Sequence, residues 1–324
     1  MSLDLSKLSI LVVDDVKAMR LIVMRVLKTL GVGILYEAED GNKAYQLYCE
    51  KRPDMIITDW HMDPVTGIDL VRKIRRSADE FNPAIPIIMM TGYNDLSRIS
   101  EARDCGITEF IVKPFSAEDI AKRITHTIKN PRDFIRGNDY VGPDRRRRVN
   151  EKQASKKRRK EDRYRIPASN DLQMKVGIGA LNPKIIQKSQ EVINNNDIDF
   201  RPMAGSLLTQ LDEAIKDYKA GERPLEDVGN EIIEIVMQIK GNAGVFHYEL
   251  MSNLANIMLT FLEKLDAVDQ DAVDIVIACH QTLRLITAKQ MRGKGGELGV
   301  TLSTELQSAC DRYYKSRENN TVMI

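Results

Sequence analysis

The first 130 residues alternate short apolar runs with longer amphipathic segments. Five runs rich in Ile, Val, Leu and Met have the length of strands: residues 8–14, 33–39, 54–58, 85–91 and 109–113. The segments between and after them have the length of helices: 16–30, 41–51, 67–78, 95–104 and 116–129. Apolar strands separated by helices are typical of a parallel sheet that is covered on both faces. We therefore predict an α/β domain over residues 1–130, with a doubly wound five-stranded parallel sheet.

This pattern stops after residue 130. Residues 131–167 contain few large apolar side chains, and they carry fourteen Lys and Arg against six Asp and Glu. The basic residues concentrate in two clusters, Arg145–Arg148 and Lys156–Lys160. Such a segment buries too little apolar surface to offset the entropy of ordering the chain. We expect residues 131–169 to form a basic, mostly disordered linker.

The chain beyond residue 170 has the periodicity of helices. Candidate helices cover 183–195, 203–219, 225–243, 247–266, 269–291 and 297–316. Ile232, Ile235, Val236 and Ile239 form an i, i+3, i+4, i+7 stripe, which indicates one buried helix face. We predict that residues 170–324 form an all-α helical bundle.

The composition and the cysteines bear on the cellular location of the protein. With 43% hydrophobic and 29% charged residues, the chain can bury sizeable cores, and it has no apolar run of the roughly 20 residues needed to span a bilayer. The N-terminus becomes acidic directly after its apolar run, unlike a signal peptide. The four cysteines are scattered: Cys49, Cys105, Cys279 and Cys310. They indicate reduced thiols and a cytoplasmic location rather than a disulfide or zinc framework.

Polar residues that could carry chemistry stand at the ends of the predicted strands. Asp14 and Asp15 end the first strand, Asp59 the third, Thr91 the fourth and Lys113 the fifth. Each has an ordinary alternative, since an aspartate can cap a helix or start a turn and a lysine can be a surface residue. The carboxyl ends of parallel strands lie along one edge, however, so all five are expected in one crevice.

Three clustered carboxylates repel one another, and one would be protonated unless a cation were present. Oxygen ligands favour a hard ion such as Mg²⁺. With the metal bound, Asp59 can stay ionised and attack a phosphoryl group, while the ion and Lys113 neutralise the charge on the transferred oxygens. Thr91 can donate a hydrogen bond to a phosphoryl oxygen.

With these motifs in view, residues 1–130 resemble the receiver domain of two-component response regulators, which has a flavodoxin-like fold. The matching stretches are "LVVDD" (11–15), "IITDW" (56–60), "GIDLVRKIR" (67–75), "IPIIMMTG" (85–92) and "GITEFIVKPF" (106–115). The resemblance implies that Asp59 is the phosphoacceptor, that Asp15 and Asp59 bind Mg²⁺ directly, and that Asp14 acts through water. It also implies roles for further residues: the backbone carbonyl of His61 as a metal ligand, Thr91 and Phe110 as a switch pair, and Lys113 as the phosphate contact, followed by a cis Lys113–Pro114 bond.

The sequence departs from the family at the residue where a proline is usual. Asp63 stands there, and Pro64 follows one position later. An additional carboxylate near the site can tune metal affinity or phosphoryl lifetime, or it can be an ordinary surface loop residue, which we favour. The His61 side chain is not expected to bind Mg²⁺, because this ion prefers oxygen.

The helical region resembles, more weakly, the histidine phosphotransfer domains. Aligning Lys240 and Gly241 with the Lys-Gly pair of that family places Met237 at the position of the phosphorylatable histidine. A thioether cannot accept a phosphoryl group, so the resemblance implies a degenerate domain that acts as a docking surface. His247 and His280 are expected to be structural or surface residues. The alternative is a generic bundle with a chance Lys-Gly pair.

These observations together predict a cytoplasmic bacterial response regulator. It would take a phosphoryl group from a histidine kinase or phosphotransfer protein, and its only catalysis would be Mg²⁺-dependent self-phosphorylation and self-dephosphorylation. Its output would be a phosphorylation-controlled protein–protein interaction, with other response regulators or a second copy of the chain as further partners. The alternatives are a nucleic-acid-binding regulator that uses the basic linker and a phosphate sink in a phosphorelay.

Overall fold

The computed structural model describes residues 3–78, 81–92, 103–138, 140–145, 164–221, 223–265 and 269–321. The chain divides into two compact units, residues 1–196 and 197–324. The expected fourth helix (95–104) falls mostly, and the cluster Lys156–Lys160 entirely, outside the described residues. Of the other basic cluster only Arg145 is described.

A five-stranded sheet forms the centre of the first unit. Its strands are β1 (Ser9–Val13), β2 (Ile34–Ala38), β3 (Met55–Asp59), β4 (Ile87–Thr91) and β5 (Glu109–Val112). They pair in the order β2-β1-β3-β4-β5, and every pairing is parallel. β1, β3 and β4 are buried at every position, because both faces are covered. This confirms the predicted doubly wound α/β fold.

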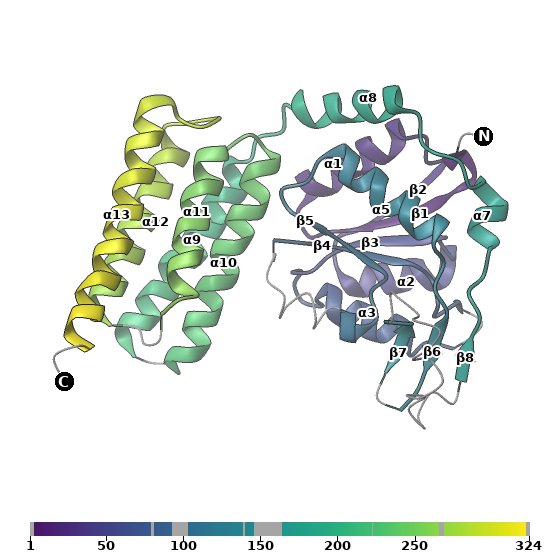
Figure 1. The fold of residues 1–324 in the computed structure, drawn as a ribbon, viewed down its shortest axis with the longest axis horizontal. Helices are drawn as coiled ribbons and strands as arrows, with labels where there is room; N and C mark the ends of the chain where they lie inside the picture. The colour runs from purple at the N-terminus through teal and green to yellow at the C-terminus, as the bar shows by residue number, and fades with distance from the viewer. Residues whose placement is uncertain are drawn as a thin grey trace. The chain divides into compact units, whose positions relative to one another are not determined.

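Helices cover both faces of this sheet (Figure 1). α1 (Lys17–Thr29) and α5 (Ala117–Lys129) lie on one face, and α2 (Gly41–Lys51) and α3 (Gly67–Arg75) lie on the other. Side-chain caps fix where three of them begin: Asp40 for α2, Thr66 for α3, and a Ser116–Asp119 capping box for α5. A 3₁₀ turn, η1 (Leu5–Lys7), precedes β1.

The boundary of the first unit differs from the expected one. Within the expected linker, β6 (Phe134–Arg136), β7 (Val141–Pro143) and β8 (Tyr164–Ile166) form a small antiparallel sheet in the order β7-β6-β8. Two helices follow it, α7 (Asp171–Val176) and α8 (Pro183–Asn194). Both pack on the first unit, which therefore continues to residue 196 instead of ending at 130.

α8 lies against α1 and α5 (Figure 1). The Gln190 side chain accepts a hydrogen bond of 2.8 Å from the backbone N–H of Ala117, the first residue of α5. Ser189 and Ile193 are buried in the contact. The predicted helix at 183–195 thus belongs to the first unit, where it covers α1 and α5.

The second unit is a helical bundle, as predicted. Its helices are α9 (Arg201–Ala220), α10 (Leu225–Val245), α11 (Glu249–Leu262), α12 (Gln270–Ala288) and α13 (Gly296–Thr321). The predicted stripe on α10 is buried at Ile232, Ile235, Val236 and Ile239. Phe200 stacks on Phe246 with ring centroids 5.2 Å apart, which closes one end of this core.

Candidate functional site

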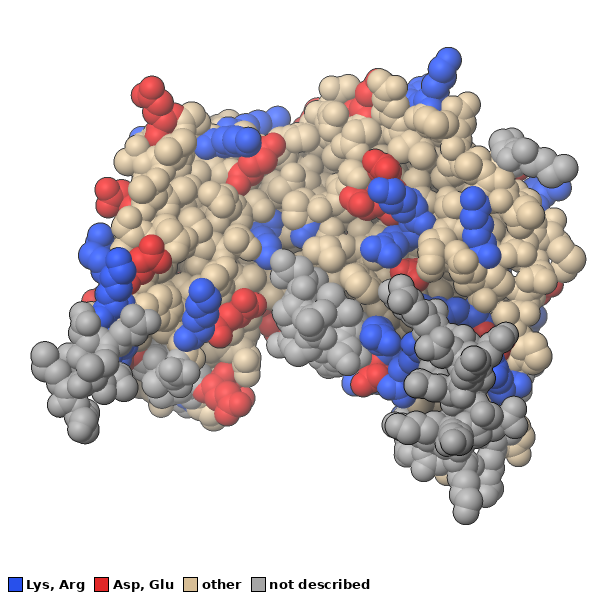
Figure 2. Space-filling view, viewed as in Figure 1, with Lys and Arg blue, Asp and Glu red and all other residues tan. Residues whose placement is uncertain are grey.

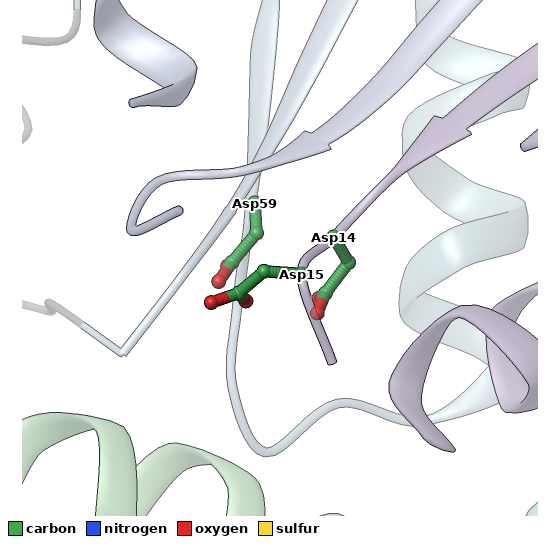
Figure 3. A group of neighbouring side chains, drawn as sticks. All are labelled: Asp14, Asp15 and Asp59. Atoms are coloured by element: carbon green, nitrogen blue, oxygen red, sulfur yellow. The ribbon is translucent and has the colours of Figure 1, made fainter. Parts of the chain in front are cut away.

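Three carboxylates meet at the carboxyl edge of the five-stranded sheet. Asp14 and Asp15 follow β1, and Asp59 is the last residue of β3. One oxygen from each of the three lies within 4.8 Å of the others. Figure 3 shows the carboxyl groups directed into one space from the ends of two neighbouring strands. Asp14 and Asp59 are buried, whereas Asp15 lies at the exposed rim.

Lys113, which follows β5, joins two of these acids. Its Nζ atom lies 2.9 Å from Oδ1 of Asp59 and 3.2 Å from Oδ2 of Asp14. The ammonium group is almost fully buried. The following Lys113–Pro114 bond is cis, as expected, and so is Asp63–Pro64. The structure therefore brings together the acids and the lysine that the sequence placed at separate strand ends.

Burial and mutual repulsion raise the pKa values of the acids. Burial first, and then Asp14, raises the pKa of the Asp15 carboxyl to about 6. Burial also raises the pKa values of Asp14 and Asp59, although the charge of Lys113 opposes both shifts. Burial disfavours the charge on Lys113, but the two carboxylates outweigh it and raise the lysine pKa. One ammonium group thus faces three carboxyls, which leaves the pocket short of positive charge.

This donor set fits a magnesium ion. The three side chains offer only oxygen atoms, and a hard divalent cation prefers oxygen and keeps several waters. A divalent cation would also relieve the repulsion that raises the pKa values of the acids. The acidic cluster is therefore the part of the described chain that is chemically suited to Mg²⁺.

Arg20 fixes the loop that carries Asp14 and Asp15, a role that was not predicted from the sequence. The residue lies on the buried face of α1, and its Nη1 donates to the backbone oxygens of Asp14 (2.6 Å) and Asp15 (3.3 Å). Its Nε contacts Glu37 on β2 at 3.3 Å. The one available signal was an arginine within the apolar stripe of α1. Arg20 fixes the main chain that carries both acids.

Gly67 allows α3 to begin directly against Asp59. A Cβ atom at this position would lie 1.9 Å from the Asp59 backbone oxygen and 3.0 Å from its carbonyl carbon. The Gly67 N–H donates to the Trp60 backbone oxygen at 2.9 Å, and the Thr58 hydroxyl donates to the Asp59 oxygen at 3.0 Å. The main chain at Asp59 is therefore held from two sides.

The predicted switch pair lies on neighbouring strands. Thr91 ends β4 and is buried, and its backbone oxygen accepts a 2.6 Å hydrogen bond from Lys113 N. Phe110 lies on β5 opposite Met89, is half-buried, and has the Arg123 guanidinium 5.5 Å from its ring. Since Met89 and Thr91 project to the same face, so do Thr91 and Phe110. The side chain of His61 packs beside Trp60, with ring centroids 6.4 Å apart.

The position aligned with the phosphotransfer histidine lies inside the bundle. Met237 and Lys240 on α10 are 3% and 9% exposed, and Gly241 is also buried. The Lys240 backbone oxygen accepts a hydrogen bond from Ser252 on α11. The bundle contains two histidines. His280 is buried, and its Nε2 lies 2.9 Å from the Leu208 backbone oxygen. His247 is half-buried and has a positive φ of 63°.

Comparison with known proteins identifies the part of the first unit that carries the acidic site. Residues 10–125 match the family model of the response regulator receiver domain. The chain is 38% identical over 117 residues to the chemotaxis protein CheY of Pseudomonas aeruginosa, a match that covers 36% of this chain and 93% of that protein. CheY-3 of Vibrio cholerae is also 38% identical over 117 residues, with 36% of this chain and 88% of the relative covered. The solved structure of Vibrio cholerae CheY4 is 29% identical, with a TM-score of 0.35, and covers 37% of this chain and 97% of its own.

The chain therefore belongs to the response regulator receiver family of two-component signalling. The family match ends at residue 125, and the bundle lies beyond it. None of the helices in the described ranges is both long enough and apolar enough to cross a membrane.

Proposed function

We propose that the chain receives a phosphoryl group on Asp59 from a histidine kinase or a phosphotransfer protein. The observation that carries this proposal is the position of Asp59 at the end of β3. It has the Lys113 ammonium at 2.9 Å and two further carboxylates within ligand distance of a shared ion. A nucleophilic carboxylate must be ionised, and Lys113 favours the ionised form of Asp59 despite its burial.

In the proposed reaction, a carboxylate oxygen of Asp59 attacks the phosphorus of a phosphohistidine. A new O–P bond forms, the N–P bond breaks, and the imidazole nitrogen of the donor keeps the bonding electrons and takes up a proton. Bound Mg²⁺ supplies positive charge for the transferred oxygens. Asp15 and Asp59 would bind that ion directly and Asp14 through a water molecule, with the His61 backbone carbonyl as a further ligand. Lys113 contacts the new phosphoryl group, and Thr91 donates to one of its oxygens. Hydrolysis by water then restores the carboxylate.

The proposed output is a change of protein partner. Thr91 is buried at the end of β4, and Phe110 is half-buried beside Arg123 on α5. A hydrogen bond from Thr91 to the phosphoryl group draws Thr91 towards Asp59 and leaves space that the Phe110 ring can enter. The surface around β5 and α5 would then differ between the two states. The bundle would serve as an interaction domain and not as a relay, because Met237, which aligns with the phosphotransfer histidine, is buried and cannot accept a phosphoryl group.

Two experiments test these steps. Incubation with a phosphorylated histidine donor should label the wild type in the presence of Mg²⁺, and neither Asp59→Asn nor chelated wild type should be labelled. Labelling of Asp59→Asn at the wild-type rate would refute the assignment. Pull-downs from cell extract, with and without the phosphoryl mimic beryllofluoride, test the output. The wild type should change its partners and Asp59→Asn should not; identical partners in every sample would contradict a phosphorylation-controlled interaction.

A further inference from the structure

A second polar cavity lies at the opposite edge of the central sheet from the acidic site. It has a volume of about 440 Å³, and the side chains that matter to its chemistry are Arg72, Arg75, Arg76, Asp104, Asn138 and Tyr140. α3 begins beside Asp59 and runs back across the sheet, so its last turn, which carries the arginines, reaches the edge where the strands begin. In Figure 2, blue side chains gather over the part of the molecule where α3 and β7 lie.

Arg75 brings a buried positive charge to this cavity. It is 1% exposed, and its donors face only backbone oxygens: Nε donates to Gly106 at 2.8 Å, and Nη1 donates to Pro83 and Ile85. Nη2 finds no acceptor, and no carboxylate pairs with the guanidinium, among the residues that the structure describes. The nearby Phe134 ring, 5.8 Å from Cζ, supplies only a weak electrostatic contact. A buried guanidinium without an anionic partner is costly.

The other charges around the cavity leave it positive. Arg76 is exposed and forms no ion pair within the described ranges, and Arg72 has only a long, exposed contact of 3.4 Å with Asp69. The one acid of the lining, Asp104, is already paired with Arg145. Three guanidinium groups thus converge on one cavity, and none of them has a buried carboxylate partner among the described residues.

Two glycines let the walls of the cavity approach each other closely. Gly106 has a φ of +98°, and a Cβ there would lie 2.7 Å from the Val141 oxygen and 3.2 Å from Cγ of Arg75. A Cβ on Gly142 would lie 2.6 Å from the Tyr140 hydroxyl oxygen. The guanidinium carbon of Arg145 in turn lies over the Tyr140 ring, 3.9 Å from the centroid of that ring. The small sheet that follows the receiver domain therefore supplies one wall of the cavity, against Arg75.

We propose that this cavity binds the phosphate group of a small molecule, either inorganic phosphate or a phosphate monoester such as a mononucleotide. Guanidinium groups donate paired hydrogen bonds to phosphate oxygens, and a dianion would supply the buried negative partner that none of the three arginines has among the described residues. The site is separate from Asp59, requires no metal, and uses residues on both sides of the boundary expected at residue 130.

The test is calorimetric titration of the full chain in 0.15 M NaCl with EDTA. All proteins carry Asp59→Asn, so that the acidic pocket does not contribute. Inorganic phosphate and AMP are the probes. We expect saturable 1:1 binding, weakened at least tenfold by Arg76→Gln and by Arg72→Gln. Lys73→Gln is the matched control: it removes one charge from the same helix, but Lys73 lies over the Tyr45 ring and does not line the cavity. It should bind as the parent does.

The remaining outcomes are equally decisive. Similar affinities for the two probes would identify phosphate itself as the ligand, and tighter AMP binding would identify a monoester; both support the proposal. The proposal is overturned if neither probe saturates at millimolar concentration. It is also overturned if Lys73→Gln weakens binding as much as Arg76→Gln does, because the attraction would then be diffuse. Unchanged affinity in Arg72→Gln and Arg76→Gln would place the binding elsewhere and would overturn it too.

Discussion

Replacing Gly67 by alanine tests how closely the start of α3 controls the acidic pocket. The added Cβ would lie 1.9 Å from the Asp59 backbone oxygen, whereas real Cβ atoms essentially never approach a neighbouring atom closer than 3.0 Å. Either the strand end at Asp59 or the first turn of α3 must therefore move by about 1.1 Å. Both are held by hydrogen bonds, including Gly67 N–H to the Trp60 oxygen, so the movement disturbs the pocket itself.

Two losses follow from this displacement. Overpacking of a rigid site costs about 1–3 kcal/mol of the free energy of unfolding. For a unit of this size, a loss of about 2 kcal/mol lowers the melting temperature by roughly 4–8 °C. A misplacement of about 1 Å at the nucleophile lowers the phosphorylation rate by up to about 100-fold.

Trp60 provides the assay, because it is the only tryptophan of the chain, is buried, and directly follows Asp59. Its fluorescence should report the melting of the first unit and the titration with Mg²⁺. Gly205→Ala is the control: this glycine lies inside α9 with no atom within 4 Å of its Cβ position, so alanine should stabilise the bundle by about 1 kcal/mol. If Gly67→Ala has the melting temperature, the Mg²⁺ affinity and the phosphorylation rate of the wild type, the steric argument is refuted.

Three further outcomes are expected. Arg20→Gln should release the loop that carries Asp14 and Asp15, and so weaken Mg²⁺ binding about 10–100-fold. Arg25→Gln, at an exposed position on the same helix, is the control and should leave the Mg²⁺ affinity unchanged. Equal Mg²⁺ affinities of the two variants in a Trp60 fluorescence titration would contradict this prediction. Burial lowers the pKa of His280, so the unfolded chain takes up a proton that the folded bundle excludes. The free energy of unfolding should therefore fall as the pH drops below about 6.5, and urea titrations of His280→Gln should lack that component. A fragment ending at residue 130 should unfold at lower urea than one ending at 196, because removing α8 uncovers α1 and α5; equal midpoints would rule this out.

The sheet could be predicted from the sequence because its three central strands, β1, β3 and β4, are almost wholly apolar. The predicted strand at 54–58 differs by one residue from β3 at Met55–Asp59, and the order of acids and lysine along the chain was enough to bring them together. The helices of the bundle were also located to within about five residues of their ends, and the stripe predicted on α10 is buried. Long periodic elements leave a strong mark on a sequence.

The small sheet left no such mark. β6, β7 and β8 have three residues each, and 27 residues lie between the paired strands β6 and β8. β7 contains Pro143, which argues against a strand by composition but is tolerated at the edge of a sheet. Arg20 and Arg75 could not be assigned either, because most of their partners are backbone oxygens, and these have no sequence signature.

The burial of Met237 determines what it would take for this bundle to acquire relay chemistry. A histidine introduced there by a single substitution would place an imidazole where a thioether now packs, 3% exposed and near Lys240 and Gly241 on the covered side of α10. Such an imidazole would be desolvated and out of reach of a receiver aspartate. Relay activity would require α10 to turn its buried stripe outward, and so a rebuilt core. The bundle is therefore separated from a phosphotransfer domain by its packing as well as by one missing side chain.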